Sequence, residues 1–350
     1  MQPLAPGEFA PDATYLNTAS YGLPPARVLA AVRAVTDDWA AGRAAPNAHD
    51  DRVDSARAAF ARLLTGATAG DVAVGSTVAA LIGPVAAALP AGAEVLVAAG
   101  DFASVPGPFR YRGDLSLRTV PLERLAAEVR PQTALVAASL VQSADGRLLD
   151  LAELRTATRA HGARLLLDAS QAAGWLPLHF DDADYWVCAT FKWLLGARSV
   201  TFLAAGPEAT ESLRPLAPGW YAAADRWSEM YAPQRLAATI RRLDDTPDWL
   251  GVTATLAGLD LVEHLTVDAV RAHDLTLADH FRTGLSALSI PVLPAPGSPI
   301  VTIPDATRLA PLLSPAGIVA TARNANLRFS FHLHNTIDDV DHALKTLGGA

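Results

Sequence analysis

Lys192 and Asp168 are the two ionisable residues of this sequence that are best placed to do chemistry. Lys192 is one of only two lysines among 28 lysine and arginine residues, and it stands in the apolar run FKWLLG. Apolar surroundings disfavour the ammonium form of a lysine and lower its pKa. A lysine with a lowered pKa is suited to forming a Schiff base with a carbonyl compound.

Asp168 follows the apolar run from Arg164 to Leu167, where a buried strand is expected to end. Open α/β sheets place their ligand-binding groups at the carboxyl ends of strands. A carboxylate there suits the pyridine nitrogen of pyridoxal phosphate, because it keeps the ring cationic and able to withdraw electrons. Each residue also has an ordinary structural interpretation, Asp168 as a helix cap and Lys192 as a lysine that extends its amine to solvent.

The composition predicts a globular protein with a small-molecule partner. The chain has 350 residues, of which 51% are hydrophobic and 18% charged, enough for one large domain and a smaller one. Its net charge is -8, and no basic block interrupts the acidic balance. Nucleic acids and anionic membranes are therefore not expected as partners.

The sequence suggests no export, membrane or metal signal. The start MQPLAPGEFAPD lacks a basic region followed by an apolar core, so we expect a cytoplasmic protein. The most apolar run, 78–99, is broken by glycine and proline and predicts no membrane span. The single cysteine, Cys188, excludes an internal disulfide, and His332 and His334 have no third ligand in view, so no metal site is predicted.

Strand-like and helical segments alternate along most of the chain, which predicts a sheet with helical crossovers. The expected strands are 71–75, 94–98, 115–120, 134–141, 164–167, 184–189 and 199–204. One helix is expected directly after Pro25. The other expected helices cover 51–64, the start of 78–99, 122–129 and 151–161.

From Gly251 the pattern changes, which predicts a small C-terminal α+β domain. A long helical stretch runs to about Leu288 and is followed by short elements. The expected strands there are 290–293, 300–303, 318–322 and 327–331, with a helix at 307–313.

The runs DASQAAGW (168–175) and ATFKWLLG (189–196) resemble the cofactor-binding core of class V, fold type I pyridoxal phosphate enzymes. This family includes cysteine desulfurases, kynureninases, isopenicillin N epimerase-like proteins and some aminotransferases. The resemblance implies an α/β fold, with a large and mainly parallel sheet of the seven-stranded type covered by helices on both faces. It also implies an N-terminal arm over 1–24, a cofactor-binding large domain over 25–250 and a small α+β domain over 251–350.

The resemblance also assigns the residues that would hold pyridoxal phosphate. Lys192 would form the Schiff base, and Asp168 and Gln171 would contact the pyridine nitrogen and the ring hydroxyl. Ser76 and Thr77, at a helix start that is itself an anion site, would bind the phosphate. The remaining expected cofactor contacts are Phe102 stacked on the ring, Thr190 and Trp220 near the phosphate, and Thr246 reaching the phosphate of a partner subunit. At Phe191 the chain departs from relatives that have histidine or tyrosine.

The substrate side of the site is implied by the run TARNANLRFSFHLHNT and by the N-terminal arm. Arg328 matches the family's arginine that forks onto the substrate carboxylate, a geometry suited to a guanidinium. Arg323 is a weaker second candidate. The other expected substrate contacts are Gln142 and Ser143, which follow an expected strand, and Asn17 and Ser20, which lie in the arm.

These parts predict a pyridoxal phosphate enzyme that acts at the alpha and beta carbons of an amino acid or amino-acid conjugate. A cysteine desulfurase of the family carries a cysteine shortly before the carboxylate-binding arginine, but the segment 314–326 has none. The prediction is a β-eliminating C–S lyase or a closely related activity, working as a homodimer with shared active sites. An aminotransferase or epimerase, and a non-catalytic ligand-binding descendant, remain alternatives.

Overall fold

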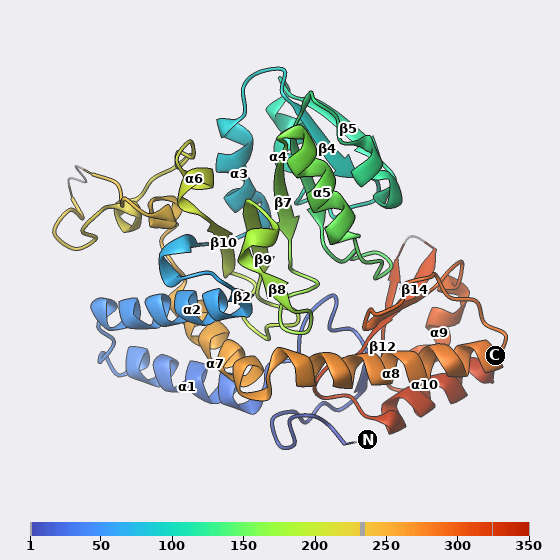
Figure 1. Cartoon of the computed structure of the whole chain (residues 1–350). Coiled ribbons are helices and arrows are strands. Elements are labelled where there is room, and N and C mark those ends of the chain that lie inside the picture. Colours follow the sequence, from blue (N-terminus) through green and yellow to red (C-terminus); the bar gives the residue numbers. More distant parts are fainter. Residues whose placement is uncertain (1, 232–234, 324, 350) are drawn as a thin grey trace.

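A seven-stranded sheet forms the centre of the molecule, as the sequence predicts (Figure 1). The computed structural model describes residues 2–231, 235–323 and 325–349. The strand order across the sheet is β3-β10-β9-β7-β6-β4-β5. These strands are β3 (Val72–Gly75), β4 (Glu94–Ala98), β5 (Ser116–Val120), β6 (Thr133–Ser139), β7 (Arg164–Asp168), β9 (Tyr185–Ala189) and β10 (Thr201–Ala205).

The sheet is mainly parallel, with one strand reversed. β10 pairs antiparallel with both β3 and β9, whereas the pairs that link β9, β7, β6, β4 and β5 are parallel. Parallel strands joined by helical crossovers are buried on both faces, and every residue of β4 and β9 is buried. The carboxyl ends of the parallel strands therefore meet at one edge of the sheet.

Helices cover both faces of this sheet, because successive strand residues point to opposite sides. Leu165 and Leu167 of β7 pack in the core that holds α2 and α7, while Leu166 packs with α3 and α4 on the other face. The helices are α1 (Ala26–Ala40), α2 (Asp50–Leu63), α3 (Val78–Ala88), α4 (Gly107–Arg112), α5 (Leu151–His161), α6 (Pro207–Thr210), α7 (Trp249–Leu265), α8 (Val267–Ala287), α9 (Ala310–Leu313) and α10 (Ile337–Gly348).

Most predicted elements of the large sheet region are confirmed, but the helix expected over 122–129 is wrong. That segment forms two 3₁₀ turns, Leu122–Arg124 and Ala126–Glu128. Pro131 disfavours the helical conformation at Arg130, and Val129 before it is already extended, so the segment ends in separate turns. Leu122 and Leu125 are nevertheless buried, which explains the helix-like apolar spacing.

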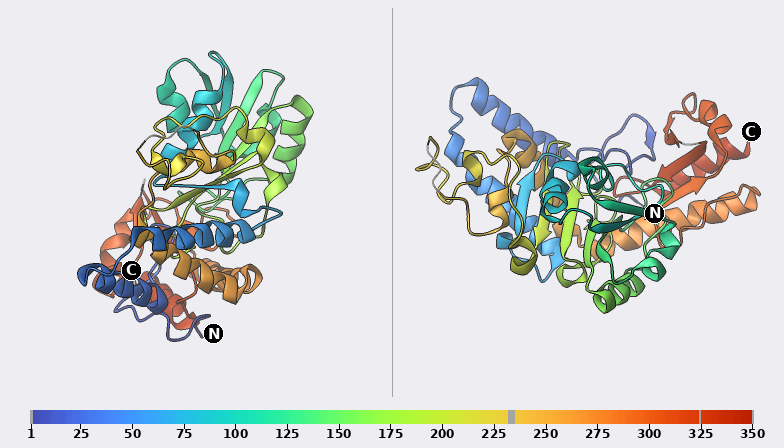
Figure 2. Two further views of the ribbon diagram at one scale, coloured as in Figure 1. Left: turned by 90° about the vertical axis from the view of Figure 1, so that its left-hand side faces the viewer. Right: turned by 90° about the horizontal axis from the view of Figure 1, so that it is seen from above.

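The C-terminal elements form a smaller unit to one side of the large sheet (Figure 2). Its three-stranded antiparallel sheet has the order β11-β14-β13, and packs with α8 and α10 around a separate core that includes Phe281 and Phe329. The remaining strands are β1 (Thr14–Tyr15), β2 (Leu64–Thr65), β8 (Leu178–His179), β11 (Ile300–Ile303), β12 (Ile318–Val319), β13 (Thr321–Arg323) and β14 (Asn326–Ser330). The exact division into domains at residues 24 and 250 stays a prediction.

Two details of this C-terminal region differ from the sequence prediction. The long helical stretch breaks at Thr266, which has a φ of 69° and caps α8 by accepting a hydrogen bond from Ala269 N. The strand expected over 290–293 is absent, although Leu293 N donates to Thr302 O over 2.8 Å. Pro291 and Pro294 remove the amide donors that a strand would need there.

Among the described residues no single helix has the length and apolar character needed to span a bilayer. Only α7 and α8 taken together are both long and apolar enough, and they bend by 84° where they meet. Nine residues of α7 are buried inside the protein, which accounts for its apolar sequence.

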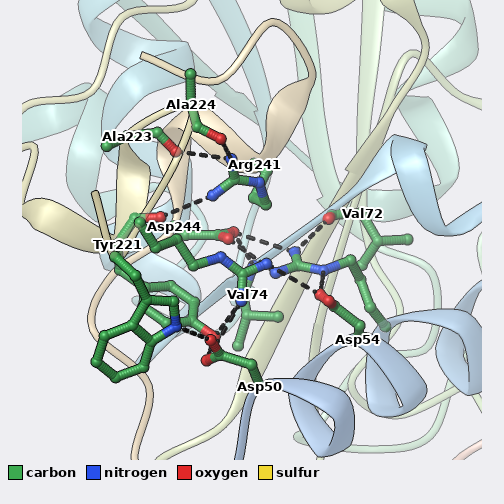
Figure 3. Close-up of polar contacts among 12 residues, drawn as sticks. Asp50, Asp54, Val72, Val74, Tyr221, Ala223, Ala224, Arg241 and Asp244 are labelled. Carbon is green, nitrogen blue, oxygen red and sulfur yellow. Dashed lines mark hydrogen bonds and ion pairs between the residues drawn. The ribbon is translucent and has the colours of Figure 1, made fainter. Parts of the chain in front are cut away.

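A network of charged side chains fastens the loop before α7 to the edge of the large sheet (Figure 3). The Arg57 guanidinium donates to both carboxylate oxygens of Asp244, over 3.1 and 2.8 Å, and to Val72 O over 2.6 Å. Asp244 also accepts from Val74 N, and Arg241 donates to the carbonyls of Ala223 and Ala224. The loop is therefore held against β3, the strand that leads to Ser76.

Asp244→Ala should lower the free energy of unfolding by about 3–5 kcal/mol, because Arg57 would stay buried without its partner. The matched control is Glu263→Ala, which removes the exposed partner of Arg62 and should cost less than about 1 kcal/mol. Urea unfolding of the two variants measures both values. Equal losses would show that the Arg57–Asp244 pair does not hold the loop.

Candidate active site

The strand register brings most of the predicted cofactor residues to one edge of the large sheet. Thr201 pairs with both Gly75 and Ala189, so the segments that begin at Ser76 and at Thr190 leave the sheet side by side. Asp168 pairs with Ser139 of β6 and with Val187 of β9. The phosphate-site helix, the lysine segment and the aspartate therefore meet where the parallel strands end.

Lys192 is buried at this edge with its amine free. Its residue is 8% exposed, and its Nζ lies 5.6 Å from the ring centroids of both Phe102 and Phe191. No hydrogen bond or ion pair to Nζ occurs within the described part of the chain. Burial lowers the pKa of Lys192 to about 8, against the opposing effect of the Asp168 carboxylate.

The N-terminal arm packs directly on the lysine segment. Gly22 N donates to Phe191 O over 2.8 Å, and a Cβ atom added to Gly22 would lie 2.1 Å from Lys192 O. Only glycine therefore fits at this position of the arm. Within the lysine segment, Leu195 is buried with a φ of 58°, a conformation that L-residues adopt rarely.

Asp168 and Gln171 lie beside the lysine segment. Asp168 Oδ1 accepts from Ser170 N over 2.8 Å, and burial raises the pKa of the Asp168 carboxyl while Ser170 and Lys192 oppose that rise. Gln171 donates its amide to Ala19 O over 2.9 Å and to Ser143 Oγ over 3.2 Å. Both amide hydrogens are thus committed within the protein, and its contact with a ring hydroxyl stays a prediction.

Arg328, Ser20 and Asn17 come together with Ser143 and Thr321. The Arg328 guanidinium donates to Ser143 O and Ser143 Oγ and, over 2.6 Å, to Ser20 Oγ, but its buried Nε has no partner among the described residues. Thr321 Oγ1 joins Ser20 Oγ at 2.9 Å and donates to Asn17 Oδ1. Burial, with the nearby charge of Arg323, lowers the pKa of Arg328 to about 10.

Ser76 and Thr77 stand where β3 passes into α3. Thr77 Oγ1 accepts from Ala80 N over 3.1 Å and so caps the helix, while its hydroxyl proton is left to donate. Ser76 is half-buried and Thr77 is exposed. The start of α3 therefore offers free backbone N–H groups and the positive end of a helix dipole to an anion.

The hydroxyl of Thr190 has partners within the protein, and its predicted contact with the phosphate stays a prediction. Thr190 is fully buried, and its hydroxyl lies 3.0 Å from both Ala197 O and Val200 O and 3.3 Å from Thr255 Oγ1. A hydroxyl has one proton, and here two carbonyls compete for it. We assign Thr190 to closing the turn that carries Lys192.

Three further residues were predicted to contact cofactor or substrate: Gln142, Trp220 and Thr246. Gln142 is buried and donates to Ser139 O over 3.3 Å. Trp220 packs edge-on against Tyr221, with ring centroids 5.2 Å apart. Thr246 is exposed one residue after Asp245, whose amide donates to Val74 O near the end of β3. Their roles toward substrate, phosphate and partner subunit stay predictions.

The structure adds Asp101 and Thr321, which the sequence prediction missed. Asp101 accepts from Ser139 N over 2.7 Å, from Ser139 Oγ over 2.5 Å and from Phe102 N over 2.7 Å, so it ties β6 to the loop that carries Phe102. The position of Asp101 directly before Phe102 is a feature of the sequence that could have pointed to it. Thr321 gave none, because it reaches the site only through pairing of β13 with β14.

Cys188, His332 and His334 do not come together in a second site. Cys188 is completely buried in β9, and burial raises the pKa of its thiol well above 9.0. His332 and His334 contact different partners, Asp274 and Tyr15 O respectively. No group of three or more possible metal ligands occurs among the described residues.

The site fits pyridoxal phosphate on its own chemistry. Lys192 offers a buried amine with no competing partner, as a carbonyl carbon requires, and Asp168 offers a carboxylate for a pyridine nitrogen. Phe102, 47% exposed, would cover a ring face, and the α3 start would take the phosphate. The unpartnered Nε of Arg328 fits a carboxylate.

Comparisons with known proteins agree with this chemistry. Residues 114–299 match the family model of aminotransferase class-V. The chain is 27% identical to the uncharacterized aminotransferase YcbU of Bacillus subtilis (84% of this chain, 82% of the relative), and 30% identical to isopenicillin N epimerase of Streptomyces clavuligerus (70% and 67%). Its fold is similar to that of the cystine C–S lyase C-DES solved with its product cysteine persulfide (TM-score 0.87, 21% identity, 96% and 97% coverage). The chain therefore belongs to the aminotransferase class-V family and is a pyridoxal phosphate-dependent enzyme.

Proposed function

We propose that this enzyme is a β-eliminating lyase that acts on an amino acid or a cysteine S-conjugate. The observation that carries the proposal is that a buried amine, Lys192, lies close enough to the buried Arg328 guanidinium for the charge of Arg328 to act on it. Similarity to a protein described as a cystine C–S lyase supports elimination, although at 21% identity that likeness concerns the fold.

Bound pyridoxal phosphate supplies an electron sink that acidifies the alpha carbon of an amino acid. Arg328 would hold the substrate carboxylate and so orient the alpha carbon toward the lysine side of the site. Lys192, with a pKa of about 8, exists partly as the neutral amine near pH 7 and can take the alpha proton. Asp168 would keep a negative charge at the ring nitrogen.

The surroundings of Lys192 favour chemistry with one base. The two rings nearest Nζ are those of Phe102 and Phe191, and neither can carry a proton. Epimerisation by two bases needs a second acid on the opposite ring face, and Phe102 is the residue proposed to cover that face. One-base reactions, elimination and transamination, are therefore favoured over epimerisation.

Sulfur transfer through a protein persulfide is not supported. It needs an accessible thiolate that reaches the substrate sulfur, whereas Cys188 is buried in a central strand and its thiol pKa is raised. An eliminating lyase needs no such thiol. Aminotransfer is the second candidate, favoured by the similarity to YcbU over most of both chains. A homodimer with shared active sites, acting in the cytoplasm, completes the proposal.

Uptake of pyridoxal phosphate by the cofactor-free protein should quicken about tenfold per pH unit up to pH about 8 and then level off, because only neutral Nζ attacks a carbonyl carbon. Stopped-flow absorbance of the visible band measures the rate. Lys192→Ala should form no band that borohydride bleaches, whereas Lys345→Ala, a change at an exposed lysine, should behave as wild type. A rate that continues to rise to pH about 10 would show an ordinary lysine pKa.

Arg328→Lys should lower kcat/KM by roughly tenfold to a hundredfold, mainly by raising KM, because lysine keeps the charge but loses the forked geometry. The assay is release of pyruvate and ammonia from a panel of cysteine S-conjugates. Arg308→Lys, at an exposed arginine of the small unit, is the matched control. A 2-oxo acid formed without ammonia would identify aminotransfer, and no turnover of any amino acid would contradict both candidates.

A further inference from the structure

A buried pair of ionisable side chains, Asp274 and His332, lies behind the lysine segment. Asp274 belongs to α8 and His332 follows β14, and both residues are 0% exposed. The Asp274 carboxylate oxygen Oδ2 is 2.8 Å from His332 Nδ1. The other ring nitrogen, Nε2, is 3.1 Å from the carbonyl oxygen of Trp193, the residue after Lys192.

These contacts fix the position of one proton and leave two positions for a second. A carbonyl oxygen only accepts, so His332 Nε2 must carry a hydrogen that it donates to Trp193 O. One proton then remains to be placed between Nδ1 and Asp274 Oδ2. It can sit on the carboxyl group, leaving both residues neutral, or on Nδ1, leaving an imidazolium beside a carboxylate.

The surroundings favour the neutral pair. The second oxygen of Asp274, Oδ1, is buried without a partner among the described residues, a poor setting for a carboxylate. In that same part of the chain no lysine or arginine forms an ion pair with Asp274. The neighbouring ionisable groups are His273 on α8 and His334 on the same turn as His332, and burial lowers the pKa of both.

The pair connects to the predicted cofactor contacts through Trp193. The rings of His332 and Trp193 meet edge to face, with centroids 5.1 Å apart. The Trp193 indole N–H donates to Gln171 Oε1 over 2.8 Å, and Gln171 in turn contacts Ser143, which binds Arg328. His332 is therefore linked through Trp193, the residue after Lys192, to Gln171, Ser143 and Arg328.

The same turn follows closely on the strand that carries Arg328 and is closed by its own hydrogen bonds. His332 N donates to Asn335 Oδ1 over 3.0 Å, and Asn335 N donates to His332 O over 2.8 Å. Arg328 lies four residues earlier in β14. One short stretch of the C-terminal unit thus carries Arg328 and, through His332, contacts the backbone of the lysine segment.

We propose that Asp274 and His332 are positioning residues for Lys192: the protonated Asp274 carboxyl donates to Nδ1 of a neutral His332, which presents its Nε2–H to the carbonyl of Trp193. The role toward Lys192 rests on the proposed function of that lysine. The protonation pattern does not, and it can be read in the cofactor-free chain.

The first experiment uses substitutions that keep or remove each hydrogen bond. His332→Gln places an amide N–H near the position of Nε2, whereas His332→Asn places it near Nδ1 and cannot reach Trp193 O. We expect cofactor affinity within twofold of wild type for the glutamine variant and weaker by roughly fivefold to tenfold for the asparagine variant. Asp274→Asn, an uncharged donor, should match wild type, and Asp274→Leu should match His332→Asn.

The second experiment measures the protons directly. Nitrogen NMR of the cofactor-free wild-type chain, with His332 assigned from the His332→Gln spectrum, should show Nδ1 unprotonated and Nε2 protonated throughout neutral pH. Protonation of both nitrogens, or of Nδ1 alone, would overturn the proposal, and so would equal cofactor affinities of the asparagine and glutamine variants. This measurement holds even if the asparagine variant does not fold. If wild type bound no cofactor, the proposed function would fail while the proton pattern could still stand.

Discussion

The constraint on which the rest of this structure depends is the burial of the Lys192 amine with no hydrogen-bond partner among the described residues. Taking an ammonium group out of water is costly, so the site lowers the pKa of the amine instead of pairing it. Keeping that amine free requires that every polar group nearby be satisfied elsewhere. Gln171 donates to Ala19 O and to Ser143 Oγ, Thr190 donates to a backbone carbonyl, and Ser143 Oγ also accepts from Arg328.

The charges around the lysine are balanced in a way that suits its proposed work. Asp168 favours the ammonium form, while Arg328 and Arg323 disfavour it. A substrate carboxylate bound to Arg328 would cancel part of the positive charge that disfavours the ammonium form of Lys192. The amine would then hold a proton more strongly when substrate is present, at the stage where the proposed reaction asks it to take one.

Three separate parts of the chain enclose this site. The large sheet contributes Asp168 and the strand that leads to Lys192. The N-terminal arm packs on the lysine segment at Gly22, and the C-terminal unit contributes Arg328 and His332. The pairing of Asn17 with Ser330 and of β1 with β12 attaches the arm to the C-terminal unit. Movement of that unit would therefore shift the substrate side and the lysine side together.

The sequence by itself determined the architecture of the large sheet and the identity of its central lysine and aspartate. Buried strands and their helices have local periodic patterns, and a lysine within apolar residues is visible without any structure. Only the tertiary structure showed that Ser20 and Ser143 bind Arg328, that Asp101 fixes the Phe102 loop and that Asp274 stands behind Lys192. These partners are up to 308 residues apart, and contacts across such separations leave no spacing in the sequence. The same reason applies to Thr190, whose carbonyl partners depend on how the turn closes rather than on its neighbours in the chain.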